Sequence, residues 1–561
     1  MRVAISFLVL SAVFGCGDDD GDPGDAGVDA MGVDGAVDSD VPTDAGTDVA
    51  PDAGPADPPE ICVGIRGNGP RITAHFGSLS RIIEHYGVPV GGAGGSSGSI
   101  TLFFLESVAM NPLIETCGDG PCDPLERANR AALMFKSILG YLEVLLESEE
   151  ALSFGVLADI IMRVQDEGIA ALLDTSPSEA VDALEAILSS DDLRSLVNPE
   201  VLQLLADSPN PVFHARDIVG ALASAASFEV TDDTILLRPG VLSFPAFAQL
   251  LGRIASFYAA YEPVDQDAME SWLSDCASPG RGMLWPMVAE LPSGESTCGE
   301  VFRTMVTDYR AAVRADEESF PTRADDPVGG ELRVLVSTSV MVGDAVTAWE
   351  AARADYLQAD EHTFSVDFDD IRFGYWGQTS DLNLVTGNPN GYPDLKTSKA
   401  LSLGEATWRE VLAFSPAEPG LARALELPGD NVSAGGWSDL QPTLVLQNLG
   451  CEKVVYLTRQ GTGSSFASGV ARLLGADDTD IDSLFSFTDA TSSTYLSIEQ
   501  SDGIWCTDWD TPPTTDIGAI TLDSYTAPLE TDDPVFESVA DPYGNITGST
   551  GLPGCTLGVD G

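Results

Sequence analysis

The sequence predicts an α/β domain with a mostly parallel central sheet, helices on both faces and a helical insertion. Two short apolar segments, at 61–66 and 88–90, each run through a glycine-rich turn into a helical pattern, at 72–86 and 99–110. A β-branched run follows much later, at 331–342. Strands that alternate with helices favour a parallel sheet covered by helices, because each parallel connection needs a crossover.

The first 60 residues are expected to precede this domain as a leader and a tether. Arg2 and the apolar run that follows it resemble a secretory signal, too short to span a bilayer as a helix of ~20 residues. Val13-Phe14-Gly15-Cys16 resembles a bacterial lipobox, so we expect residues 1–16 to be a lipoprotein signal and Cys16 to be acylated. The chain would then be exported and anchored to a membrane of the bacterial envelope. An uncleaved or ordinarily cleaved signal is the alternative.

Residues 17–60 are rich in Asp, Gly, Ala, Val and Pro, and we expect them to form a disordered acidic linker. They contain no complete calcium-binding loop. The formal net charge of the chain is −61, which argues against nucleic acid as a partner because phosphate contacts need a basic surface. We expect the α/β domain at 61–460, its helical insertion at about 117–330, and a C-terminal extension at 461–561 packed on the domain.

The cysteines indicate disulfides. The chain has nine, and without Cys16 eight remain, an even number that suits an exported protein. Their spacing suggests the pairs Cys117–Cys122 and Cys276–Cys298, although the sequence leaves the connectivity open. Zinc bound at the first pair is the alternative, but no second Cys or His pair lies near it in the sequence.

The insertion is expected to be helical with one hairpin. Apolar residues recur there at spacings of three and four. Helices are expected at 125–148, 151–173, 177–189, 191–207 and 242–261, and a strand or hairpin at 228–237. The aromatic residues of the last helix are expected to be core, with an acyl-chain cleft as the alternative. Beyond the insertion we expect strands at 363–368 and 371–376, then a helix and strand within 444–456.

The segment Gly94-Gly95-Ser96-Ser97-Gly98 carries the pattern of a nucleophile elbow, G-x-S-x-G between a strand and a helix. The tight turn holds the serine oxygen out from the sheet and aims a helix N-terminus at it. The outer glycines, Gly94 and Gly98, let the helix pass close to the strand. Ser96 is therefore the candidate nucleophile, and an ordinary Gly/Ser turn is the alternative.

The preceding strand-to-helix turn, Gly67-Asn68-Gly69-Pro70-Arg71, offers backbone N–H groups to an anion, but lacks the P-loop pattern. Segments 67–79 and 94–98 together resemble the patatin-like phospholipase family, which pairs G-G-G-x-R-G and A-H-x-G-x-L with G-x-S-x-G. The resemblance implies a three-layer patatin-like fold. It also implies oxyanion donors in the group Gly67, Asn68, Gly69 and Ser97. His75 matches a family histidine, interpreted as structural rather than as a base.

A second cluster agrees with the first in order. Segment 411–420 is similar to the family's A-S-x-A-x-P, and 432–442 to D-G-G-x-x-D-N-x-P. Gly435 and Gly436 match the two motif glycines, but Ala434 stands where the family has the general base of its Ser–Asp dyad. A serine hydroxyl needs a base to become a good nucleophile. The replacements are Asp439, which we rank first, Asp430, or one of the four histidines.

The resemblance implies a lipid acyl hydrolase in which Ser96 attacks an ester and the turn N–H groups hold the oxyanion. Its partners would be a lipid or fatty-acyl ester substrate and, through Cys16, a membrane; no metal or organic cofactor is implied. Two alternatives stay open. One is a catalytically impaired patatin-like scaffold that binds lipid or a protein partner, which Ala434 favours. The other is a serine hydrolase that acts on peptides or small esters. The oligomeric state is not determined.

Overall fold

The computed structural model places a sheet and its covering helices, and leaves the expected signal, linker and several expected helices outside the described residues. The described residues are 60–67, 72–146, 197–199, 229–230, 234–237, 242–277, 297–316, 320–341, 347, 364–367, 371–377, 401–417, 425–427, 431–433, 435, 442–448, 450–459, 501 and 503–507.

The centre of the fold is one mixed sheet that is mostly parallel, as the sequence predicts. Among the described residues its strands follow the order β10-β9-β7-β2-β1-β13-β14, with β12 paired to β7 and β11 to β12. Neighbouring strands from β7 to β14 run parallel, whereas β9 and β12 run antiparallel to β7. The strands are β1 (Cys62–Ile65), β2 (Gly91–Gly95), β7 (Arg333–Met341), β9 (Ile371–Gly377), β10 (Leu401–Gly404), β11 (Leu425–Leu427), β12 (Asn431–Ser433), β13 (Val454–Arg459) and β14 (Gly503–Thr507).

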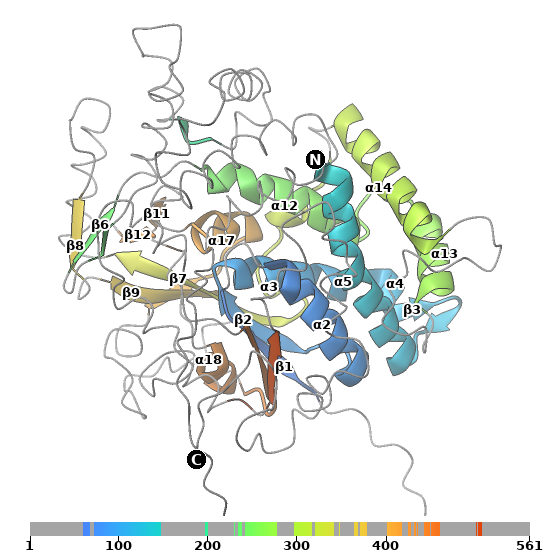
Figure 1. Cartoon of the computed structure of the whole chain (residues 1–561), viewed down its shortest axis with the longest axis horizontal. Helices are drawn as coiled ribbons and strands as arrows, with labels where there is room; N and C mark the ends of the chain where they lie inside the picture. The colour runs from blue at the N-terminus through green and yellow to red at the C-terminus, as the bar shows by residue number, and fades with distance from the viewer. Residues whose placement is uncertain are drawn as a thin grey trace, which may run out of the picture.

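Helices cover both faces of this sheet (Figure 1). Val63 and Ile65 of β1 join the larger apolar core with α2 (Ile72–Tyr86) and α3 (Ser97–Ala109). Cys62 belongs instead to a smaller cluster with Leu446 of α18 (Pro442–Asn448). The alternation follows from the two-residue period of a strand, which sends successive side chains to opposite faces.

The second strand lies three residues later than the apolar run at 88–90 predicts. β2 is Gly91-Gly92-Ala93-Gly94-Gly95, a composition that by propensity disfavours a strand. Close packing explains it. A Cβ on Gly92 would lie 2.3 Å from Leu102 of α3, and one on Gly94 would lie 2.5 Å from the Ile65 carbonyl oxygen. Glycine stands at positions 91, 92 and 94 because neighbouring atoms leave little room for a side chain there.

The insertion packs as a helical layer on the α2–α3 side. Its described elements are α4 (Pro112–Glu115), β3 (Thr116–Cys117), β4 (Gly120–Pro121), α5 (Pro124–Leu146), α12 (Phe244–Tyr258), α13 (Gln266–Cys276), α14 (Cys298–Ala315) and η3 (Arg323–Asp325). The aromatic residues of α12 are core, as expected: Phe244, Phe247, Phe257 and Tyr258 are all buried. The hairpin β5 (Glu229–Val230) and β6 (Thr234–Leu237) pairs with β8 (Phe364–Asp367) in a separate small sheet.

Three disulfides link described residues, and two of them confirm the sequence prediction. Cys117–Cys122 closes the β3–β4 hairpin, and Cys276–Cys298 joins α13 to α14. The third, Cys62–Cys451, ties the start of β1 to the segment before β13. No helix in the described part of the chain combines the length and apolar composition of a membrane span.

Candidate functional site

Ser96 sits on the turn between β2 and α3 with a backbone that serine rarely adopts. Its φ is 53° and its ψ is −129°, and it is one of two described non-glycine residues with positive φ. Such a conformation costs about 1–3 kcal/mol and persists only where the surroundings hold it in place. Ser96 occupies the N-cap position of α3, yet its side chain makes no capping hydrogen bond. Its half-buried hydroxyl is therefore not used to cap the helix.

The glycines around Ser96 let three backbones meet there. A Cβ on Gly98 would lie 2.6 Å from the Ile65 carbonyl oxygen. Gly67, just beyond the end of β1, is equally confined, because a Cβ there would lie 2.9 Å from the Ser96 Cβ. The first residue of the glycine-rich turn thus packs directly against the serine, at the carboxyl ends of two neighbouring parallel strands. Such strand ends are where open α/β sheets bind ligands.

Hydrogen bonds hold both peptide groups of Ser96. Its N–H donates to the Ser415 Oγ at 3.0 Å, and its carbonyl accepts from the Ser99 N–H at 2.9 Å and the Ser99 Oγ at 2.5 Å. Ser97 is fully buried in the first turn of α3, which carries no acidic side chain. The positive end of the helix dipole at Ser96 is therefore not offset within that turn, an arrangement that favours an anion.

The second sequence cluster reaches the same place through α17 (Trp408–Phe414) and β12. Ser415 follows α17 directly and, besides accepting from Ser96, donates to the Ser337 carbonyl of β7 at 2.6 Å. Ser433, the last residue of β12, donates to the Phe414 carbonyl at 3.3 Å. A Cβ on Gly435 would lie 1.6 Å from the Phe414 carbonyl oxygen, so only glycine fits there.

His75 packs against α3, one turn beyond Ser96. Its Nδ1 lies 2.8 Å from the Thr101 Oγ1, and the Thr101 hydroxyl donates to the Ser97 carbonyl at 3.0 Å. A hydroxyl has one proton, so His75 Nδ1–H must be the donor to Thr101. The imidazole is fully buried. This arrangement supports the structural interpretation of His75, because its Nδ1 is committed to holding α3.

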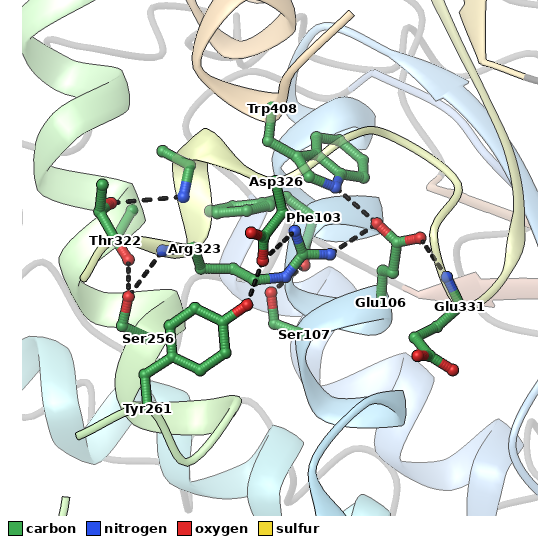
Figure 2. A network of polar contacts seen from close by, with 12 residues as sticks. Phe103, Glu106, Ser107, Ser256, Tyr261, Thr322, Arg323, Asp326, Glu331 and Trp408 are labelled. Atoms are coloured by element: carbon green, nitrogen blue, oxygen red, sulfur yellow. Dashed lines mark hydrogen bonds and ion pairs between the residues drawn. The ribbon is translucent and has the colours of Figure 1, made fainter. Parts of the chain in front are cut away.

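A buried ion pair fastens the other end of α3 (Figure 2). The Glu106 carboxylate accepts from Arg323 Nη2 at 2.7 Å and Trp408 Nε1 at 2.5 Å, and also from the N–H groups of Glu331 and Leu332. Glu106, Arg323 and Trp408 are almost completely buried. Four donors satisfy this carboxylate, as a buried charge requires.

The structure brings together the predicted residues Gly67, Gly94, Ser96, Ser97, Gly98 and Gly435. Asn68, Gly69, Ala434, Gly436, Asp439 and Cys16 lie outside the described residues. Sequence reasoning gave no role to Ser415 or Glu106. Ser415 lies in the segment similar to A-S-x-A-x-P, and that motif is the signal that could have found it. Nothing in the sequence distinguishes Glu106 from the other acidic residues of predicted helices. Within the described ranges, no three His, Cys, Asp or Glu side chains gather as metal ligands.

Comparison with protein-family models, with curated proteins and with solved structures found no match for the chain.

Proposed function

We propose that the chain is a serine acyl-ester hydrolase of the patatin type that acts on lipid or fatty-acyl esters. The observation that carries this proposal is the backbone of Ser96, at φ 53° and ψ −129° on a strand-to-helix turn. A serine that is kept in a strained turn against a glycine-rich turn, and whose side chain makes no capping hydrogen bond, suits a nucleophile. The order of the two motif clusters supports the patatin assignment over other serine hydrolases.

In this proposal the Ser96 Oγ attacks the ester carbonyl carbon while a base takes the hydroxyl proton. The carbonyl oxygen becomes an oxyanion, which N–H groups of Asn68, Gly69 and Ser97 stabilise. The tetrahedral intermediate collapses to an acyl-enzyme, and the leaving alcohol takes the proton from the base. Water then attacks the acyl-enzyme with help from the same base, which releases the fatty acid and restores Ser96.

Asp439 is the base that we propose, because it is the acidic residue that the segment resembling D-G-G-x-x-D-N-x-P retains. The chain enters at Gly435, against the Phe414 carbonyl, and leaves at Pro442, which packs against Gly64 of β1. β2 and its Ser96 turn lie between β1 and β7 in the sheet. The described ends of the segment that contains Asp439 therefore lie next to Ser415, which bonds Ser96, and next to β1, the neighbour of β2.

We also propose that acylated Cys16 anchors the exported protein to the envelope membrane. The lipobox-like residues 13–16 and the acidic segment that follows support this. In the full chain, Cys16→Ser is expected to move the protein from the membrane fraction to the soluble fraction. Wild-type protein that stays soluble after expression in a bacterium that processes lipoproteins would rule the anchor out.

The hydrolase is tested on the full chain, purified in detergent, with a fluorophosphonate probe and mass spectrometry of the adduct. We expect labelling at Ser96 in the wild type and none in Ser96→Ala. Asp439→Asn is expected to slow labelling by roughly 10²–10⁴-fold, the usual contribution of a general base. If Asp439→Asn is labelled as fast as the wild type, another residue is the base.

Ala434 favours a second function, an impaired scaffold that binds lipid without hydrolysis. Ala434→Asp separates the two. If the wild type is not labelled and Ala434→Asp is, the turn and the oxyanion donors are intact and only the base is missing. If neither folded protein is labelled, the elbow is an ordinary turn and the hydrolase proposal is wrong.

A further inference from the structure

The Ser415 hydroxyl connects the Ser96 turn to the middle of the sheet. It donates to the Ser337 carbonyl oxygen at 2.6 Å and accepts from the Ser96 N–H at 3.0 Å. Ser337 pairs with Gly95 in the β2–β7 register, so its carbonyl lies at the level where β2 ends. Because the Ser415 proton is committed to Ser337, its lone pairs face Ser96 and the direction of both bonds is fixed.

A strained backbone needs such external support. The bonds from Ser99 hold the Ser96 carbonyl, but they come from α3 itself and move with the helix. Ser415 belongs to another element, 319 residues away along the chain, and it is fully buried. It therefore fixes the Ser96 N–H relative to the sheet rather than relative to α3.

The geometry points to Ser415 as the positioning residue for the Ser96 nucleophile, an inference that rests on the proposed hydrolase function. Ser415 touches the backbone of Ser96 and acts through it. Without this hydroxyl, the Ser96 N–H and the Ser337 carbonyl both lose a partner, and the turn can relax toward an ordinary helix start. The Ser96 Oγ then no longer points toward the position from which an ester carbonyl must approach.

The test compares Ser415→Ala, Ser415→Thr and the matched control Ser80→Ala in the full chain. Ser80 is also fully buried, and its hydroxyl donates to a backbone carbonyl, of Gly77, at 2.9 Å on α2. Two quantities are measured: hydrogen exchange of the Ser96 amide, and the rate constant and affinity of fluorophosphonate labelling. In Ser415→Ala we expect about 10- to 100-fold faster exchange and a comparably lower rate constant, with unchanged probe affinity.

Ser415→Thr keeps the hydroxyl and is expected to restore both quantities, whereas Ser80→Ala should leave both at their wild-type values. If the Ser96 amide exchanges at the same rate in Ser415→Ala and in the wild type, Ser415 does not hold the Ser96 N–H and the inference is wrong, whatever the labelling shows. Faster exchange with an unchanged labelling rate constant overturns the positioning role. A wild type that is never labelled overturns the proposed hydrolase instead, a result that the exchange measurement keeps separate.

Discussion

At the scale of single residues, the glycines shape the site as much as the residues with side chains do. β2 carries four glycines in five positions, and Gly67, Gly98 and Gly435 are confined by neighbouring backbone. Their role is close approach: β1, β2 and α3 meet at Ser96 only because no Cβ separates them. The sequence marks Gly94 and Gly98 by motif, but it places the strand three residues too early, because glycine itself carries no strand signal.

Gly94→Ala is expected to destabilise the protein by about 1–3 kcal/mol, because the added methyl would lie 2.5 Å from the Ile65 carbonyl oxygen. Gly120→Ala is the control, since a Cβ there meets nothing within 4 Å and should change stability by no more than about 0.5 kcal/mol. Chemical denaturation measures both. Equal midpoints for the two variants would contradict the close-approach explanation.

At the scale of elements, α17 is joined to both ends of α3. Trp408 at its start donates to Glu106, and its indole lies 5.1 Å from the Phe103 ring, centroid to centroid. Ser415 at its end accepts from Ser96. The guanidinium of Arg323, which binds Glu106, also lies over the Phe103 ring at 5.6 Å. α17 therefore holds α3 in place from the Ser96 turn to the last turn of the helix.

Glu106→Gln is expected to cost about 3–5 kcal/mol of unfolding free energy, because it removes the fully buried counter-ion of Arg323 and leaves that guanidinium with the longer, partly exposed pair to Asp326. Glu115→Gln breaks the exposed pair with Arg127 and should cost about 0–1 kcal/mol. Urea unfolding of the two variants and the wild type measures this difference. A Glu106→Gln variant as stable as Glu115→Gln would mean that the buried ion pair contributes no net stability.

At the scale of the whole molecule, the described parts form helical layers on both faces of one sheet, drawn together from distant segments. Cys62 and Cys451, 389 residues apart, form a disulfide between β1 and the segment before β13. β14 adds a strand from beyond residue 500 to the edge next to β13. On the helical side, rings of α5, α12 and α14 gather in one buried cluster that includes Tyr141, Phe257 and Tyr309.

The buried tyrosines of this cluster make the free energy of unfolding depend on pH in alkaline solution. Burial raises the pKa of Tyr141, Tyr258 and Tyr309 above the ordinary value of about 10. Because the folded pKa values exceed the unfolded ones, their stabilisation is complete below about pH 10 and is lost as the pH rises further. The free energy of unfolding should therefore fall above about pH 10.

Tyr141→Phe keeps the ring and removes one ionisable group. We expect it to reduce that fall by up to about 1.4 kcal/mol per pH unit above pH 10, with little change at pH 7. Denaturation curves across this range measure the slope, and the difference in tyrosinate absorbance between the wild type and Tyr141→Phe should appear together with unfolding. Tyrosinate that forms at Tyr141 in the folded protein below pH 10 would contradict the burial argument.

The sequence by itself determined the class of fold, the helices α2, α3, α5 and α12, the strands β1, β7, β8 and β9, two disulfides, and the Ser96 turn with its glycines. These depend on short-range patterns: apolar periodicity, turn residues and cysteine spacing. Only the tertiary structure decided the strand at Gly91–Gly95, the strand β14, the bond from Ser96 to Ser415 and the ion pair of Glu106 with Arg323. Each of these depends on which distant backbone or side chain lies opposite, and that information is present only once the chain has folded.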